Sequence, residues 1–384
     1  MSSPSQRRFC WLDWFRFLAA FEVMAYHARG HVWVHYAQME ATSKSWLTWS
    51  FFVMTHWGGE AVVLFFVLSG FLVGGKVLER SLDRSFDLGA YARDRVSRIY
   101  VPFVPALVVS GIIGYLAGLQ PISVSSFLGN LAGLQAVCAR AYGSNLPLWT
   151  LAYEIWFYVL GGCLGVLVCR KGQARAIALC GAMFVFALFT RLQASLLFCW
   201  LLGAAGYLLL LAEDVSALVF GGGVALAVFG LVFCEYISAH HNSFGNFLAS
   251  GRVAELIFSL GLAIVFPYLA KRAPVSKPVL GFERFGGRLA SFSYTLYLTH
   301  YPLLSLWTKY RPQKFAALDA HSFSWFIIEC VSCLLFAFVL YLPFEAQTAR
   351  VRNWLKPKIP AGERAIGRPA RLADNLARDQ EPNA

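Results

Sequence analysis

The feature that most constrains the fold is an apolar segment over residues 9–28 that carries a few ionisable side chains. At 1.5 Å per residue, about 20 residues span the hydrocarbon core of a bilayer, so this segment is long enough to cross a membrane. It contains Asp13, Arg16, Glu22 and His27. Ionisable groups inside a membrane are costly and usually mark a functional site. The segment therefore predicts a membrane helix that carries part of a site.

The spacing of these side chains brings two of them to one face of the helix. Eleven steps of about 100° return His27 to nearly the face of Arg16, ~16 Å further along the axis. Asp13 precedes Arg16 by three residues and can pair with it. The spacing favours one polar track with Arg16 and His27 at its ends. The alternative is a structural Asp–Arg pair with a histidine at the far interface.

The composition indicates a membrane protein. Of the 384 residues, 58% are hydrophobic and only 14% are charged, which is well below the charged fraction of a soluble protein. The net charge of +12 does not indicate a nucleic-acid partner, because the basic residues lie between apolar runs, as the positive-inside rule expects. We expect a lipid bilayer around the chain and no bound nucleic acid.

The sequence predicts an all-α fold, a polytopic transmembrane helical bundle with about ten spans. Cytoplasmic placement of the N-terminus puts 24 of the 33 Lys and Arg residues on the cytoplasmic side and eight outside, with Arg16 within a span. This asymmetry favours an even number of spans with both termini cytoplasmic. The predicted spans are 9–28, 51–75, 100–119, 146–169, 176–190, 194–212, 216–237, 253–270, 289–308 and 323–345.

Two domains of different character follow from the same pattern. Residues 9–345 form the predicted membrane domain. Residues 346–384 lack apolar runs and are rich in Pro, Arg and Ala, which is typical of a disordered basic cytoplasmic tail next to anionic lipid. His240 and His241 have no Asp, Glu or Cys at ligand spacing, so we expect no metal site.

Five motifs in order resemble the integral-membrane acyltransferase-3 family, whose members include O-acetyltransferases. They extend over residues 12–345 together with the spans between them. The motifs are Leu12-Asp13-Trp14-Phe15-Arg16 continuing to His27, Phe65-Phe66-Val67-Leu68-Ser69-Gly70-Phe71-Leu72, Arg95-Val96-Ser97-Arg98-Ile99-Tyr100-Val101-Pro102, Leu148-Trp149-Thr150-Leu151-Ala152-Tyr153-Glu154, and Ser293-Tyr294-Thr295-Leu296-Tyr297-Leu298-Thr299-His300. The resemblance implies transfer of an acyl group, commonly acetyl, from acyl-coenzyme A to a hydroxyl.

The candidate catalytic residues are His27, Glu154, Arg16 and Asp13. An unperturbed histidine is largely neutral at pH 7, so His27 can accept the proton of the attacking hydroxyl as general base. A lone buried carboxylate needs a base or a proton, so Glu154 is expected to pair with the histidine across two helices. Arg16 could bind a phosphate of coenzyme A or stabilise developing negative charge.

Seven further residues are candidates for binding the substrate or the donor. Arginines at the cytoplasmic mouth of a span have the fork geometry that suits phosphates, although they also serve as membrane anchors. Ser69 could line a donor channel or allow close helix packing, and His300 could be a core histidine. The set is Arg93, Arg95, Arg98, Ser69, Trp149, Tyr294 and His300.

The resemblance implies an acyltransferase of a bacterial inner (plasma) membrane that acts on a cell-surface or exported carbohydrate. Acyl-coenzyme A, commonly acetyl-coenzyme A, would be a donor substrate, and no bound cofactor is expected. An acyltransferase for a lipid or a small-molecule glycoside is one alternative. A transporter with a polar intramembrane path is the other. Two features of the sequence oppose a transporter. The polar residues concentrate in the first third of the chain, and the sequence predicts no paired broken helices in two matching halves.

Overall fold

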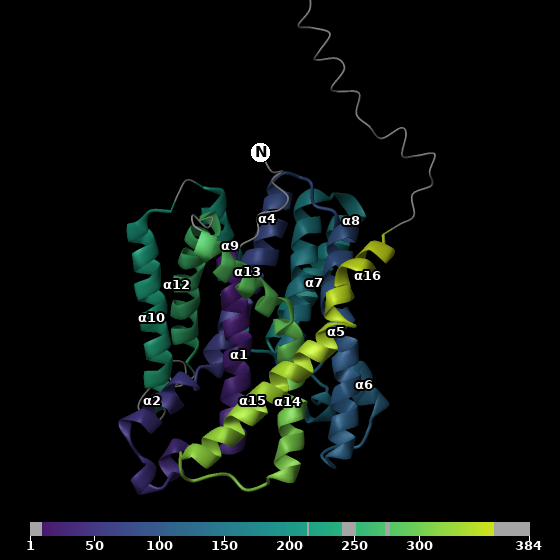
Figure 1. Ribbon diagram of the computed structural model, residues 1–384. Helices are drawn as coiled ribbons and strands as arrows, with labels where there is room; N and C mark the ends of the chain where they lie inside the picture. The colour runs from purple at the N-terminus through teal and green to yellow at the C-terminus, as the bar shows by residue number, and fades with distance from the viewer. Residues whose placement is uncertain (1–9, 213–214, 240–250, 273–276, 357–384) are drawn as a thin grey trace, which may run out of the picture.

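The computed structural model describes residues 10–212, 215–239, 251–272 and 277–356. Over these residues the protein is a helical bundle without β-strands (Figure 1), which confirms the predicted all-α fold. Its α-helices are α1 Cys10–Val32, α2 Trp46–Met54, α3 Gly58–Ser69, α4 Gly75–Leu82, α5 Leu88–Leu116, α6 Val124–Leu131, α7 Trp149–Cys169, α8 Gly172–Phe189, α9 Ala194–Leu211, α10 Ala217–Ala239, α12 Arg252–Lys271, α13 Lys277–Ser291, α14 Ser293–Tyr310, α15 Ala320–Tyr341 and α16 Thr348–Trp354.

Helix α1 lies in the middle of the bundle, and α15 runs obliquely across the front of it (Figure 1). The helices that pack on α1 include α3, α13, α14 and α15. The apolar core forms two main clusters that both include residues of α1. One is centred on α3, α5, α7 and α9, and the other joins α1 to α14 and α15. Side chains on α1 therefore reach both halves of the core.

Eight segments of the described chain are long and apolar enough to cross a membrane. Helices α1 and α14 fall outside this set because their polar content is higher, although each coincides with a predicted span. The first 18 positions of α1 include Asp13, Arg16 and Glu22. These two predicted spans are the ones that carry the candidate residues His27 and His300. The count of ten spans stays a prediction.

The first turn of α1 and helix α16 lie at the same end of the bundle (Figure 1). In that region Trp14 stacks on Phe282 of α13, with 4.3 Å between ring centroids. Arg352 of α16 pairs with Asp94, near the start of α5, at 3.4 Å. An even number of spans requires the first and the last helix to begin and end on the same side of the membrane in this way. That this end faces the cytoplasm stays a prediction.

The structure differs from the expected start of the tail at residue 346. The 3-10 turn η7 (Glu345–Gln347) is followed directly by α16, and α16 packs on α5. The difference arises because these residues are polar and charged rather than apolar, so no span pattern marks them. Residues 357–384 and the pair His240 and His241 lie outside the described residues.

A close helix crossing fixes the position of α3. The chain passes from α3 into one π-helical turn, η4 (Gly70–Gly74), before α4. A Cβ atom on Gly70 would lie 1.9 Å from the carbonyl oxygen of Trp200, and one on Gly203 would lie 2.0 Å from that of Val67. Small residues allow membrane helices to approach this closely. Gly70 is therefore required for packing, whereas Ser69 beside it remains available to a cavity.

Candidate functional site

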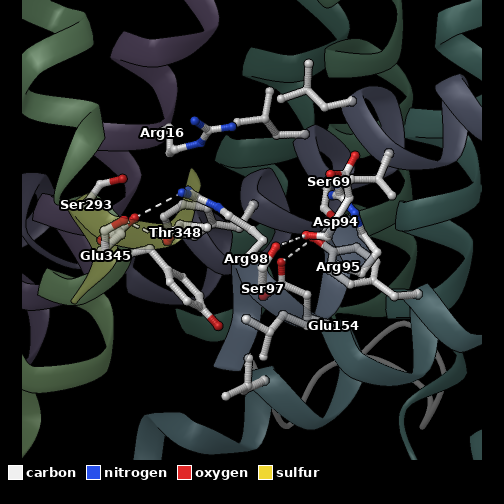
Figure 2. A pocket seen from close by; sticks show the side chains of 18 of the residues that line it. Arg16, Ser69, Asp94, Arg95, Ser97, Arg98, Glu154, Ser293, Glu345 and Thr348 are labelled. Carbon is white, nitrogen blue, oxygen red and sulfur yellow. Dashed lines mark hydrogen bonds and ion pairs between the residues drawn. The ribbon is translucent and has the colours of Figure 1, made fainter. Parts of the chain in front are cut away.

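A cavity of about 640 Å³ opens among α1, α3, α4, α5, α7, α14 and α16. We call it the basic cavity because cations outnumber anions in its lining. Its charged residues are Arg16, Lys76, Arg80, Arg95, Arg98 and Arg352, with Asp94, Glu154 and Glu345. Figure 2 shows Arg16 of α1 together with Arg95 and Arg98 of α5 around this cavity. Helix α4, which carries Lys76 and Arg80, lies at the end of the bundle where α16 and the start of α1 lie (Figure 1).

Arg98 is held by an ion pair at the wall of the basic cavity. Its guanidinium lies 3.1 Å from Oε1 of the buried Glu345 and over the ring of Tyr294, at 5.7 Å from the centroid. The other oxygen of Glu345 accepts hydrogen bonds from the backbone N–H of Thr295 at 3.0 Å and from its hydroxyl at 2.7 Å. Glu345 thus ties α5 to the start of α14 and orients Arg98.

Arg95 is held differently, by aromatic rings. Its guanidinium lies 5.3 Å from the ring centroid of Tyr158 and 6.0 Å from that of Tyr91. It forms no ion pair with a described carboxylate, and its buried Nε has no hydrogen-bond partner in the described chain. A desolvated guanidinium with open donors is suited to bind an anion. Arg95 is therefore more available to a ligand than Arg98.

Glu154 lies in the basic cavity and not beside His27, which corrects the expected pair. Its Oε1 accepts a hydrogen bond of 2.6 Å from the hydroxyl of Tyr158. Ser69 in turn donates to that hydroxyl at 3.4 Å. The three side chains form a short polar chain from α3 to α7. The expectation failed because the sequence shows the depth of a residue in its helix but not which neighbour faces it.

Thr150 and Tyr297 line the basic cavity away from α4 and α16. The Thr150 and Tyr297 hydroxyls are 2.7 Å apart. The Tyr297 hydroxyl is also 3.2 Å from the carbonyl oxygen of Pro147. The ring of Tyr297 lies 5.8 Å from that of His300. This part of the cavity wall therefore leads directly to the two histidines.

His27 lines a second cavity of about 930 Å³, which holds four histidines and six aromatic residues. We call it the aromatic cavity. Its aromatic and ionisable lining consists of Tyr26, Trp33, Tyr36, Trp49, Phe52, Tyr301, His27, His31, His35, His56, Arg29, Glu235 and Lys314. The ring of His27 stacks near that of His300 at 5.4 Å and meets that of Tyr301 edge-on at 5.0 Å. His27 and His300 thus lie next to each other between the two cavities.

His300 is fully buried, and its hydrogen bonds fix its tautomer. Nδ1 lies 2.8 Å from the carbonyl oxygen of Tyr297 and 3.1 Å from that of Leu296. Because carbonyl oxygens only accept, Nδ1 carries the hydrogen and Nε2 of the neutral ring carries the lone pair. Nε2 has no hydrogen-bond partner in the described chain. His300 is therefore a buried hydrogen-bond acceptor beside His27.

The single polar track expected on α1 is interrupted. Between Arg16 and His27 the same face carries Ala20 and Val23, which are buried in the apolar core. Arg16 consequently lies in the basic cavity and His27 in the aromatic cavity. The two ends of the expected track therefore lie in two separate cavities.

None of the other predicted residues lines the aromatic cavity. Asp13 pairs with Arg16 at 3.6 Å. Ser69 and Tyr294 line the basic cavity. Arg93 and Trp149 are absent from the lining of these two cavities, and their role in binding stays a prediction.

Five charged residues of the basic cavity escaped the sequence analysis, namely Lys76, Arg80, Asp94, Glu345 and Arg352. Lys76 and Arg80 are four residues apart and share one face of α4. That spacing next to the second span could have marked them. Glu345 and Arg352 were assigned to the end of a span and to a tail, where no pattern distinguishes them.

The match to known families agrees with the resemblance. The model of a family described as an acyltransferase domain matches residues 10–342, which is most of the chain. The chain belongs to the acyltransferase-3 family. No curated protein and no solved structure matches it. The chain is accordingly an acyltransferase with membrane-spanning helices. Two elements of this acyltransferase, η7 and α16, lie beyond the matched region and also line the basic cavity.

Proposed function

We propose that this acyltransferase binds acyl-coenzyme A, commonly acetyl-coenzyme A, in the basic cavity. We also propose that it transfers the acyl group to a hydroxyl of a cell-surface or exported carbohydrate in the aromatic cavity. The observation that carries the proposal is the position of His27 and His300. They lie between the basic cavity and the aromatic cavity, and buried apolar side chains of α1 separate these two cavities. A donor and an acceptor would each approach this pair from its own cavity.

The basic cavity suits the donor because coenzyme A carries several phosphates. Arg16, Arg95 and Lys76 would bind them, since arginine presents a fork of donors and lysine a compact charge. Because Arg16 lies in this cavity and not beside His27, we assign it to phosphate binding and not to charge stabilisation at the reacting carbonyl. The thioester would then extend past Ser69 towards Thr150 and Tyr297.

His27 would act as the general base. It takes the proton of the acceptor hydroxyl while the hydroxyl oxygen attacks the thioester carbonyl carbon. The carbon–sulfur bond then breaks, and the thiolate of coenzyme A leaves and recovers the proton. The lone pair on Nε2 of His300 would accept a hydrogen bond from the imidazolium of His27. This contact would orient His27 and stabilise the charge it acquires.

The test is acyl transfer by the purified protein in detergent. The protein is incubated with acetyl-coenzyme A and a panel of oligosaccharides, and both free thiol and the mass of each oligosaccharide are measured. The proposal predicts thiol release that depends on an oligosaccharide, together with a mass gain of one acetyl group on it. Acylation of lipids alone would favour the lipid acceptor. Solute uptake into liposomes without any thioester cleavage would establish a transporter instead.

A further inference from the structure

The aromatic cavity contains charge that the chemistry of the transferred group does not require. Its lining includes Arg29 and Lys314 as permanent cations and Glu235 as the only carboxylate among the described residues. Glu235 is already engaged, since its two oxygens lie 2.9 and 3.1 Å from Nδ1 of His56. A neutral sugar would leave the two cations without a counter-ion.

Arg29 is fixed in place within this cavity. One of its guanidinium nitrogens donates to the carbonyl oxygen of Phe52 at 3.1 Å. The group lies 5.0 Å from the ring centroid of Phe52 and 5.5 Å from that of Tyr26. Its Nε is buried and has no hydrogen-bond partner in the described chain. A guanidinium held in this way is preorganised for an anion and need not lose much side-chain freedom on binding one.

The nearest carboxylates do not neutralise Arg29. Glu22 and Glu235 are close enough to interact with it electrostatically, but neither forms an ion pair with it among the described residues. Glu22 instead accepts a hydrogen bond of 3.2 Å from the backbone N–H of Trp57. Removing a guanidinium from water without pairing it is costly. An anionic ligand would supply the missing partner.

Lys314 adds a second cation from the segment between α14 and α15. Its side chain is exposed and has no described hydrogen bond, so it can approach a ligand from the mouth of the cavity. Trp49, from α2, is 55% exposed and borders the same cavity. An indole face provides a flat apolar surface on which the C–H face of a sugar ring packs. Aromatic rings and cations therefore line the same cavity.

From these observations we infer that the acceptor is an acidic saccharide, whose carboxylate or phosphate group is bound by Arg29 and Lys314. The inference rests on the proposed function and specifies its acceptor class. The sugar ring would lie against the aromatic side chains, with one hydroxyl at His27. Arg29 is two residues from His27, and both line the same cavity. The anionic group would thus lie on the reacting sugar or on its neighbour.

Binding is tested without any need for turnover. The full chain in detergent is heated with trigalacturonate, with its methyl ester, with a phosphorylated oligomannose or with maltotriose, all at equal ionic strength. A ligand that binds only the native state raises the melting temperature. We expect trigalacturonate or the phosphorylated oligomannose to stabilise the wild type, and the ester and maltotriose to bind about tenfold more weakly, since one ion pair of moderate strength corresponds to roughly that factor. Which of the two acids binds distinguishes a carboxylate from a phosphate.

Arg29→Gln and Lys314→Gln should each reduce the stabilisation by the acidic ligand. Arg140→Gln is the control, because Arg140 is exposed, lies on the same predicted side of the membrane and is not in the lining of the aromatic cavity. Lys314→Gln also covers the case in which Arg29→Gln fails to fold, since Lys314 anchors no described backbone group. Equal stabilisation by acids and by the neutral sugars, or none by either acid, overturns the inference.

The acylation assay separates this inference from the proposed function. With an acceptor that turns over, the inference predicts a lower acceptor KM for the acid than for its methyl ester, and a higher acceptor KM in Lys314→Gln with an unchanged donor KM. Transfer with equal KM values for acid and ester refutes the inference and leaves the proposed function intact. Acid binding that is lost in Arg29→Gln, without transfer to any acceptor, refutes the proposed function and leaves only the binding of an acidic saccharide by Arg29.

Discussion

The hydrogen bonds of single residues decide which groups can react. His300 and His27 are neighbouring imidazoles, but only the tautomer of His300 is fixed by backbone carbonyls. His27 lines an open cavity, and its ring lies 5.4 Å from that of His300, whose Nε2 has no hydrogen-bond partner in the described chain. This asymmetry favours His27 as the base and His300 as the residue that positions it.

We predict that His27→Ala abolishes acyl transfer while leaving the protein folded. Removal of a general base typically costs ~10²–10⁴-fold in rate. The measurement is thiol release and acetylation of an acceptor by purified protein, with melting temperature as the check on folding. His35→Ala, which removes a histidine of the same cavity away from His300, is the control. Wild-type transfer by His27→Ala would show that another group is the base.

Arg95 and Arg93 provide a matched pair on one helix. Arg95 lines the basic cavity without an ion pair, whereas Arg93 is absent from that lining. We predict that Arg95→Lys raises the donor KM by about tenfold with little change in acceptor KM, because charge is kept and the bidentate fork is lost. Arg93→Lys should leave the donor KM unchanged. Equal effects of the two substitutions would reduce Arg95 to a membrane anchor.

At the scale of the elements, the crossing of η4 and α9 positions Ser69 and the cavity wall. We predict that Gly70→Ala destabilises the protein by at least ~1–3 kcal/mol, because the new Cβ meets a backbone carbonyl that cannot move alone. Gly221→Ala in α10 is the control, since nothing lies within 4 Å of a Cβ at that position. Thermal unfolding in detergent measures both. A melting temperature of Gly70→Ala equal to that of the wild type would contradict the close crossing.

The apolar elements could be predicted from sequence, but the amphipathic ones could not. The predicted span 146–169 corresponds to the observed Leu146–Cys169, because a continuous apolar run has no other stable place than a membrane. Helices α6, α13 and α16 were not predicted. They are short or polar, so their stability comes from packing on neighbours and not from a periodic pattern.

The candidate site was predictable only in part, for a related reason. The five motifs contain several of the residues that line the cavities, including Arg16, Ser69, Glu154 and Tyr294. They did not show how the residues divide between cavities. That division depends on the packing of α1 against α3 and α14, and helical periodicity within one segment contains no information about its neighbours. The expected pairing of Glu154 with His27 failed for this reason.

At the scale of the whole molecule, the basic cavity and the aromatic cavity lie in different regions of one bundle and differ in their lining residues. The basic cavity lies towards the end where α1 begins and α16 lies, and the basic residues predict that this end is cytoplasmic. We predict that reporter fusions after residue 120 or 316 read outside and that fusions after residue 384 read inside. An outside reading at residue 384 would contradict the even number of spans.

The measurement that tests the central claim most directly is a sided acylation assay in proteoliposomes. An acceptor oligosaccharide is sealed inside the vesicles, and acetyl-coenzyme A is added only outside. The account predicts that the enclosed acceptor becomes acetylated by the molecules whose basic cavity faces outward, and that His27→Ala vesicles yield none. Acetylation that requires donor and acceptor on the same side, with no product from separated substrates, would contradict transfer between the two cavities.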